Sequence, residues 1–596
     1  MKFIQSFLKN SEYIRAALWR YRSYVFFGLI ALAIVDVLEA VAPLLVKRAV
    51  DLVVVHGVQQ ELFEIAGIYL LITIVQGLGR YGWRMYLIRS SLYAGRDMRL
   101  KFSDHLMHLS ASFFDRKRVG DLMSMAVSDV EAVRMAIGAG VLTFADAVFY
   151  LISIPIAMFW LSPKLALISF APILVVPWVV IYCERRIHER FQKTQESLSE
   201  LSAMAQENIN GIRVVKSFAR EDAQIRRFEA MGREYVQLNL RLNRVQSIFG
   251  PVLDFVTCLG LVGVLLFGGK DVMQGSLTIG TLIAFHRYFQ KMAWPMTALG
   301  MAFTLYERAV ASTDRVRGIL VEKSDIVESP APKLPEGASL KSSPSRWKTA
   351  GKIEFRKLSF RYRSDLPWVL KDLDLTIEAG ERIGILGAIG SGKSTLLSLI
   401  PRMYPIDPGM LFVDGVDVNH WPLKHLRAQI GYVGQEVFLF KQSVWENVAM
   451  GFSEGAPEQA IRLAAIEGEV KVEDGVDLSG GQKQRLTIAR ALVREPSILI
   501  LDDALASVDV ETEGKILENL ASRPGKKTEL FAVHRVSVVQ SLDRIVMMDH
   551  GKIIQMGTHV QLMQERSGLY RRYYDQQNLE NELTHYAHRV GKEANS

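Results

Sequence analysis

Two stretches of the sequence have residue types and spacings suited to binding a nucleotide. The first, GAIGSGKST at residues 387–395, fits G-x-x-x-x-G-K-[ST] and lies between the apolar run RIGIL and the helix-like run LLSLIPRMY. In such a loop, backbone N–H groups surround phosphate oxygens, Lys393 reaches the β- and γ-phosphates, and the Ser394 hydroxyl binds Mg²⁺. This context makes a chance glycine turn a poor explanation. The residues predicted to bind the phosphates are Gly387, Gly390, Ser391, Gly392, Lys393, Ser394 and Thr395.

The second stretch, SILILDD at residues 497–503, is an apolar strand pattern that ends in two aspartates. Asp502 is placed to hold Mg²⁺, often through water. Such a strand alone is weak evidence, because any buried strand can end in an aspartate. Together with the glycine-rich loop it predicts ATP and Mg²⁺ as ligands. Asp503 then occupies the position in which a nucleotide-hydrolysing enzyme often keeps its general base.

Further motifs give the chain a family resemblance. LSGGQKQR at 478–485, GYVGQ ending at Gln435, ASVD at 506–509 and AVH ending at His534 stand in one consistent order. With six apolar segments ahead of them, they make the chain closely resemble an ATP-binding-cassette half-transporter of the exporter type. The resemblance covers nearly the whole chain. It implies that two cassettes enclose two ATP molecules, each held by the phosphate loop of one chain and the LSGGQ signature of the other.

The same resemblance implies roles for individual residues. Gln435 would sense Mg²⁺ and the attacking water and link to the membrane helices, and His534 would contact the γ-phosphate. Asp509 would lie at the interface between cassettes, and Tyr362 in SFRY would stack on adenine. The residues expected to face the partner's nucleotide are Ser479, Gly480, Gly481 and Gln482.

The sequence departs from the family pattern in two places. The family usually has Asp-Glu where this chain has Asp502-Asp503, and a misplacement of order 1 Å can cost a catalytic group roughly a hundredfold in rate. LDDALASVD resembles the weakened chain of bacterial heterodimeric multidrug exporters. The helical subdomain between Gln435 and Leu478 is also short, although Glu473 resembles the acidic residue before the signature.

Apolar patterning divides the 596 residues into a membrane part and a soluble part. About 20 apolar residues in helix are needed to cross a bilayer core of about 30 Å. Six segments approach this length, near residues 24–46, 62–88, 136–160, 164–184, 245–269 and 276–300. The predicted fold is a six-helix transmembrane domain with long cytoplasmic helical extensions, followed by an α/β P-loop ATPase domain with a helical subdomain. Its expected parts are an interfacial helix (1–23), the transmembrane domain (24–321), a linker (322–350), the ATPase domain (351–575) and a tail (576–596).

The charge pattern predicts the orientation of the chain. Residues 89–135 contain eight Lys or Arg and the connection near 49–61 contains none, so the positive-inside rule places the former, both termini and the ATPase domain in the cytoplasm. We attribute the net charge of +8 to cytoplasmic loops next to the membrane spans and not to a surface that binds nucleic acid. The two cysteines give no sign of a disulfide framework or metal cluster. Location in a bacterial inner membrane follows from the resemblance and from the absence of a targeting segment.

Ionisable residues inside predicted spans are candidates for a cavity or a gate, with pairing between helices as an equally good explanation. Asp36 and Glu39 share one helical face and are the first choice for a cation-sensitive pair; the others are Asp254, His286 and Arg287. Aromatic residues at 285, 288, 289 and 294 fit either a cavity or ordinary packing. The tips of the cytoplasmic extensions, near 113–122 and 207–218, are expected to touch the ATPase domain.

The sequence therefore predicts one half of an ATP-driven exporter of drugs or lipids, with a second half-transporter, membrane lipid and an amphipathic substrate as partners. A heterodimer is favoured. Three alternatives remain at this stage: a homodimeric exporter or lipid flippase, an ATP-gated channel or regulatory subunit, and a soluble nucleic-acid ATPase, with which six apolar spans conflict.

Overall fold

The computed structural model describes residues 12–57, 60–173, 176–335, 348–451, 457–466 and 478–579. It divides into two compact units, one holding Met1–His105 and Gly120–Glu322, the other Leu106–Val119 and Lys323–Ser596. Glu473, much of the shortened subdomain, the middle of the predicted linker and the final residues of the predicted tail lie outside the described ranges. The predicted interfacial helix is described only from Glu12 onward, as α2 (Glu12–Arg20).

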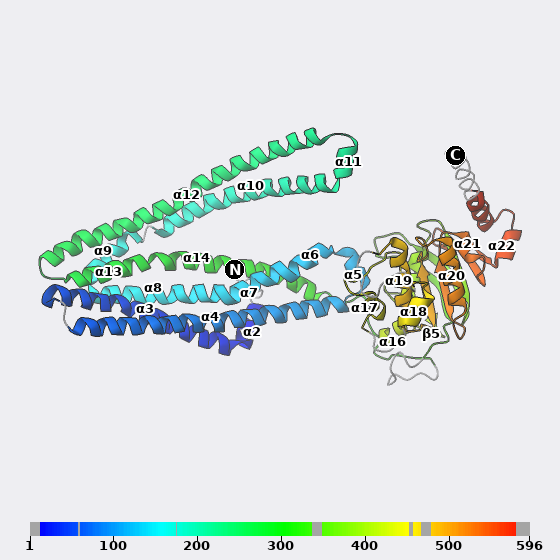
Figure 1. Cartoon of the computed structure of the whole chain (residues 1–596), viewed down its shortest axis with the longest axis horizontal. Helices are drawn as coiled ribbons and strands as arrows, with labels where there is room; N and C mark the ends of the chain where they lie inside the picture. Colours follow the sequence, from blue (N-terminus) through cyan, green and yellow to red (C-terminus); the bar gives the residue numbers. More distant parts are fainter. Residues whose placement is uncertain are drawn as a thin grey trace. The chain divides into compact units, whose positions relative to one another are not determined.

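The first unit is helical. Its main helices are α3 (Arg22–His56), α4 (Gln60–His108), α6 (Val119–Ser124), α7 (Val130–Met135), α8 (Val141–Leu161), α9 (Pro163–Ile173), α10 (Val176–Asn210), α11 (Ile212–Ser217), α12 (Glu221–Met273), α13 (Ile279–Lys291) and α14 (Ala293–Val321). Two short π-helical turns, η1 (Met125–Asp129) and η2 (Ala136–Gly140), join α6, α7 and α8. The helices α10 and α12 run side by side, and α3 packs against α8 and α13 (Figure 1).

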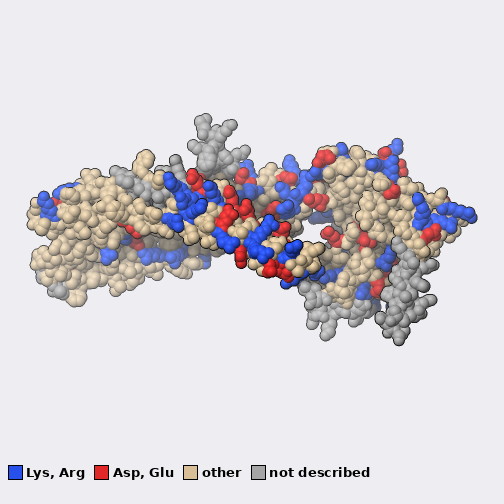
Figure 2. All heavy atoms as spheres, turned by 90° about the horizontal axis from the view of Figure 1, so that it is seen from above, with Lys and Arg blue, Asp and Glu red and all other residues tan. Residues whose placement is uncertain are grey.

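Four stretches of described helix are long and apolar enough to cross a membrane: Arg22–Val55, Gln60–His108, Val119–Leu161 and Asp254–Met273. The predicted span at 164–184 is helical over its described residues. The predicted span at 276–300 is helical only from Ile279 onward and is divided at Met292 into α13 and α14. On the face shown in Figure 2, charged side chains are sparse at the end of this unit that holds α9 and α13. They are more numerous toward the other end of the unit. This distribution is that of a protein with a band facing hydrocarbon.

The aromatic residues predicted for a cavity or for packing are mostly core residues. Phe285, Tyr288 and Phe289 are at most 1% exposed and belong to a buried cluster with residues of α8, α9 and α12. Trp294 is exposed, and its indole N–H donates to Asp146 at 2.7 Å. Packing therefore accounts for the first three.

The second unit contains two sheets. The antiparallel sheet has the order β2-β1-β4-β5, with β1 (Ile353–Phe360), β2 (Leu370–Ile377), β4 (Leu411–Val413) and β5 (Val416–Asp417). The larger sheet has the order β10-β9-β3-β8-β7-β6, with β3 (Arg382–Gly387), β6 (Ile430–Val433), β7 (Ile498–Asp502), β8 (Thr528–Ala532), β9 (Arg544–Asp549) and β10 (Lys552–Gly557). All its neighbouring pairs are parallel except β9–β10. Strands β7 and β8 are buried throughout, as expected of parallel strands covered on both faces.

Helices surround these sheets. They are α15 (Lys393–Leu399), α16 (Leu423–Ala428), α17 (Val444–Ala449), α18 (Pro457–Leu463), α19 (Gly480–Leu492), α20 (Val510–Ala521), α21 (Val536–Val539) and α22 (His559–Gln564). The alternation of strands and helices agrees with the α/β fold predicted for the ATPase domain.

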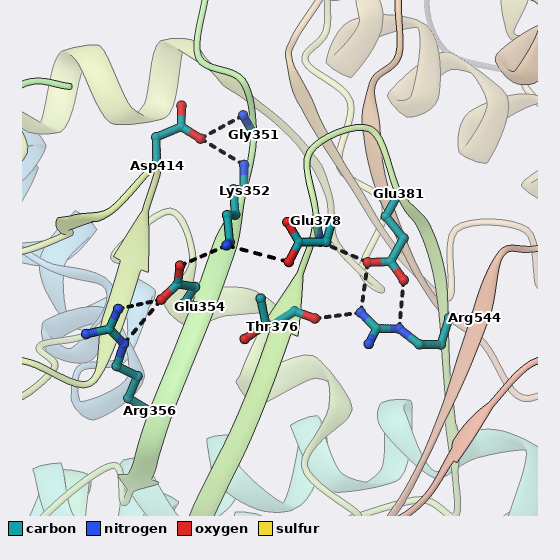
Figure 3. A network of polar contacts seen from close by, with 9 residues as sticks. All are labelled: Gly351, Lys352, Glu354, Arg356, Thr376, Glu378, Glu381, Asp414 and Arg544. Atoms are coloured by element: carbon teal, nitrogen blue, oxygen red, sulfur yellow. Dashed lines mark hydrogen bonds and ion pairs between the residues drawn. The ribbon is translucent and has the colours of Figure 1, made fainter. Parts of the chain in front are cut away.

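A polar network joins the two sheets (Figure 3). Arg544 of β9 donates to the backbone oxygen of Thr376 in β2 and pairs with Glu381 just before β3. On β1, Glu354 pairs with Lys352 and Arg356. The network fixes the antiparallel sheet against the strand that leads into the phosphate loop.

One segment of the first predicted tip packs within the second unit. In α5 (Ala111–Arg116), the Asp115 carboxylate accepts a hydrogen bond from the Tyr404 hydroxyl at 2.9 Å. Arg116 pairs with Asp325 at 3.5 Å. The prediction that this tip touches the ATPase domain is confirmed, whereas α11 at the second tip belongs to the first unit.

Candidate functional site

The candidate site lies where the parallel strands of the larger sheet end. The registers Ile385↔Ala532, Leu501↔Phe531 and Val433↔Leu501 align the carboxyl ends of β3, β8, β7 and β6. The residues that follow these ends are the phosphate loop, His534, Asp503 and Gln435. Open parallel sheets bind ligands at this edge. Segments about 150 residues apart in sequence are thereby brought together by the sheet register alone.

The phosphate loop depends on glycine at three positions. Gly390 and Gly392 have φ of +81° and +99°, which side-chain-bearing residues rarely adopt. A Cβ added to Gly387 would lie 2.2 Å from the Met548 backbone oxygen. The chain can therefore form this tight turn between β3 and α15 only with these glycines. Backbone N–H groups of such a loop at a helix N-terminus can surround an anion.

The Lys393 side chain is folded over the loop. Its ammonium donates to the backbone oxygens of Gly387 at 2.7 Å and Ala388 at 3.1 Å. Burial lowers the pKa of Lys393, and the nearby charges of Asp502 and Asp503 oppose that change. A cation held this way is positioned to bind phosphate oxygens as a compact charge.

The predicted magnesium ligands lie together. The Ser394 hydroxyl donates to the Asp502 carboxylate at 2.9 Å, although the two residues come from different elements, α15 and β7. Burial raises the pKa of Asp502, while the bond from Ser394 and the charges of Lys393 and His534 lower it. A hydroxyl and a carboxylate oxygen are hard donors of the kind that Mg²⁺ prefers, so this pair fits the ion.

Asp503 follows directly after β7 in an unusual backbone conformation. It has φ of +52°, and its N–H donates to the Ala532 backbone oxygen at 2.8 Å. A residue other than glycine held in the left-handed region carries backbone strain, and such residues cluster at functional sites. Its side chain is half-buried, and its charge acts on both Asp502 and Lys393. The structure thus places Asp503 beside the predicted phosphate and magnesium ligands.

Tyr362 lies at the other side of the loop. Its hydroxyl forms a 2.8 Å hydrogen bond with the Thr395 hydroxyl, and its ring is 38% exposed. The rings of Phe360 and Tyr404 hold it edge to face, with centroids 5.2 and 5.0 Å away. This arrangement leaves an aromatic surface beside the phosphate loop, as adenine stacking needs.

Sequence reasoning did not identify Tyr404. Its signal was weak, a single aromatic in the turn that follows α15. The pKa of Tyr404 is raised, mainly by burial and to a smaller extent by the hydrogen bond to Asp115. With Tyr362 and residues of α5 it lines a groove with a cavity volume of about 450 Å³.

The signature forms the start of α19. Ser479 caps this helix, accepting from the Gln482 N–H at 3.3 Å, while the Gln482 side chain accepts from the Ser479 N–H at 2.9 Å. Ser479 and Gly480 are exposed. A Cβ on Gly481 would lie 2.9 Å from the Ser507 backbone oxygen, so the signature packs tightly against the loop after β7.

The remaining predicted residues flank this centre. Gln435 is exposed just beyond β6, and the Asp509 carboxylate caps α20 by accepting from the Thr512 N–H at 2.9 Å. The backbone oxygen of His534 accepts from Gln577 at 2.6 Å. That contact comes from a helical segment near the end of the described chain, and no motif predicted it.

Comparisons with known proteins agree with this geometry. Residues 25–296 match the family model of the ABC transporter transmembrane region, and residues 370–506 match the model described as ABC transporter. YheI of Bacillus subtilis (strain 168), a probable multidrug resistance ABC transporter ATP-binding/permease protein, is 34% identical over 96% of this chain and 98% of its own length. MdlA of Escherichia coli (strain K12), a multidrug resistance-like ATP-binding protein, is also 34% identical, over 96% and 97%.

Two further similarities extend the comparison. An ATP-dependent lipid A-core flippase of Aromatoleum aromaticum is 32% identical, with 83% of each chain covered. The structure of a bacterial Atm1-family ABC exporter with ATP bound is similar with a TM-score of 0.74 at 23% identity, covering 93% of this chain and 99% of the other. This structural likeness extends over both units and concerns the fold.

Proposed function

We propose that this chain, which belongs to the ABC transporter family, is one half of a dimeric exporter of amphipathic small molecules. The chain joins a helical transmembrane domain to an ATPase domain, and its ATP hydrolysis is coupled to transport. The observation that carries the proposal is the convergence of Lys393, Ser394, Asp502 and Asp503 at one edge of the sheet.

The chemistry of the site is in-line attack of water on the γ-phosphate. Lys393 would hold the phosphate oxygens, and the loop N–H groups would fix their position. Ser394 and Asp502, with Gln435, would hold Mg²⁺, and the ion would supply positive charge that neutralises the phosphate oxygens. Asp503 is the candidate to orient the water and accept its proton, and His534 would contact the γ-phosphate.

The cargo is proposed from the relatives. YheI and MdlA are described as multidrug resistance proteins, and the Aromatoleum protein as a lipid A-core flippase. Drugs and lipids share an amphipathic character, which favours export of amphipathic drugs or lipids by this chain. By the positive-inside argument, the ATPase domain and both termini would face the cytoplasm.

A heterodimer is the favoured assembly. Asp503 is one methylene shorter than the glutamate expected there, which weakens the chain's own site, whereas its signature is intact and exposed at the start of α19. The chain would bind ATP at its own phosphate loop and complete the hydrolysing site of a different half-transporter. A homodimeric exporter or lipid flippase is the second candidate, in which Asp503 must act as a sufficient base.

Transport in sealed inside-out vesicles tests the proposal. The full-length chain, with any half-transporter that co-purifies, is expected to drive ATP-dependent uptake of doxorubicin or of a fluorescent phospholipid. The variant Lys393→Ala in the same chain is the control for ATP binding. Movement that merely follows the concentration gradient when ATP is added would contradict export and support an ATP-gated channel.

A further inference from the structure

A cluster of ionisable side chains lies within the helices of the first unit, remote in sequence from the ATP site. Asp36 and Glu39 come from α3, Arg80 from α4, Asp146 from α8 and Lys291 from α13. Helices α3, α8 and α13 pack against one another in this region (Figure 1). The cluster therefore joins four helices that the transport cycle would have to move.

Glu39 is the well-paired member of this cluster. Its carboxylate accepts from Arg80 and from the Tyr150 hydroxyl, and Lys291 pairs with it at 3.2 Å. Both cations of the cluster thus bond to the same carboxylate. The pairing explanation given from the sequence holds for Glu39.

Asp36 is in a different situation. Its side chain is 2% exposed, and its neighbours along the helix, Leu32 and Val35, are 2% and 3% exposed. Among the described residues, the Asp36 Oδ2 atom has no hydrogen-bond partner. The charged groups that act on it are Glu39 on its own helix, Arg80, Asp146 and Lys291.

The charge balance of the cluster is uneven. Three carboxylates face two cations, and Asp146 already accepts from the Trp294 indole. An ionised carboxylate without a partner in a low-dielectric interior costs several kcal/mol, so such a group is neutralised instead. One proton brings the cluster to zero net charge. A proton can neutralise Asp36 without a cavity. A hydrated cation would need space beside the carboxylate, which a residue only 2% exposed does not offer.

We propose that Asp36 is a proton-binding site, with the acid proton on Oδ2 in this packed arrangement of α3, α8 and α13. The reaction is simple dissociation, in which the carboxylic acid releases H⁺ to water and becomes a carboxylate. The titratable or charged neighbours are Glu39 on α3, Arg80 on α4, Asp146 and Tyr150 on α8, and Tyr288 and Lys291 on α13. Acid stabilises the packed arrangement, and helix movements that admit water release the proton.

The link to transport rests on the proposed export function, but the proton itself is measured without ATP or substrate. Infrared difference spectra of the full-length chain in lipid nanodiscs, recorded in H₂O and D₂O at neutral pH, report the C=O stretch of a protonated carboxylic acid. This band is expected in the wild type and lost in Asp36→Asn. Asp254→Asn, the same change at an exposed carboxylate on α12, is the matched control and keeps the band.

Three results would overturn the proposal: no such band in the wild type, an unchanged band in Asp36→Asn, or loss of the band in Asp146→Asn alone. A second measurement covers a folding defect. The unfolding midpoint of the wild type and of Asp254→Asn should fall as pH rises through neutrality, and that of Asp36→Asn should be high and insensitive to pH. ATP-driven uptake by the wild type is measured separately, so failed export and an absent proton are distinguished.

Discussion

At the scale of single residues, the proposed function depends most on the side chain that follows β7. Asp503 is held at φ +52° next to Asp502, yet it carries one methylene less than a glutamate, about 1.5 Å of reach. Its backbone position is fixed by the bond from its N–H to Ala532, so the strand end has little freedom to move the carboxylate toward a bound water. We infer that ATP is held well here and hydrolysed slowly.

Lys393 provides the most direct test of ATP binding by the chain. Lys393→Ala removes a buried ammonium, and charge-assisted bonds of about 1.5–3 kcal/mol correspond to a roughly 10- to 100-fold loss of ATP affinity. Titration with a fluorescent ATP analogue measures this loss. Lys371→Ala, at an exposed lysine of β2, is the control and should bind as the wild type does. Equal affinity of both variants would place the nucleotide elsewhere.

At the scale of elements, the start of α19 is proposed to act on the nucleotide of a second chain. Alanine at Gly480 meets no atom within 4 Å, and the same is true at Gly514 inside α20. Neither change disturbs the fold of this chain. Their effects should therefore differ only if a partner contacts the signature.

Gly480→Ala should lower the ATPase rate of the assembled exporter and leave both the unfolding midpoint and the affinity of the chain's own phosphate loop unchanged. The reason is that the added methyl would occupy the space that the partner's γ-phosphate needs. Gly514→Ala is expected to keep full activity and to be neutral or slightly stabilising, because a helix interior favours alanine over glycine by about 0.5–1 kcal/mol. Full ATPase activity in Gly480→Ala would argue against an intermolecular role for the signature.

The contact between Tyr404 and α5 suggests a connection between the adenine side of the site and the membrane helices. Tyr404→Phe keeps the ring against Tyr362 and removes the hydrogen bond to Asp115, a loss of roughly 1 kcal/mol. Substrate stimulation of ATPase activity should fall while ATP affinity stays the same. Asp115→Asn, whose amide oxygen still accepts the bond, should retain stimulation. The connection is ruled out if Tyr404→Phe and the wild type are stimulated equally.

Much of the site could be predicted from sequence because its motifs are local. The glycines at 390 and 392 reveal a turn by their type and spacing, and the apolar run before Asp502 reveals a buried strand. The hydrogen bond from Ser394 to Asp502 joins residues 108 positions apart. Their proximity could be predicted from the sequence only because both motifs are expected to bind the same Mg²⁺ ion. The tertiary contacts of Tyr404 and Gln577 left no such pattern. They depend on packing between elements, which no local spacing encodes.

At the scale of the whole molecule, the account requires two chains. In the function proposed above, the phosphate loop and the signature of one chain serve different ATP molecules, so a chain with a weakened base and an intact signature would need a second chain to form a complete hydrolysing site. The sequence predicts six spans, and among the described residues four helical stretches are long and apolar enough to cross a membrane. A span broken as α13 and α14 are, at Met292, relies on its neighbours for its place in the membrane.

The most direct test of this account is ATP hydrolysis by the chain purified alone in lipid, wild type beside Asp503→Glu, with dimerisation measured in the same samples. Where the chain dimerises with itself, we predict negligible wild-type turnover and a gain of roughly a hundredfold in Asp503→Glu, the cost of a catalytic group misplaced by about 1 Å. A failure of both chains to dimerise would point to an obligatory partner. Robust turnover by the wild-type dimer would contradict the weakened site and favour a homodimeric exporter.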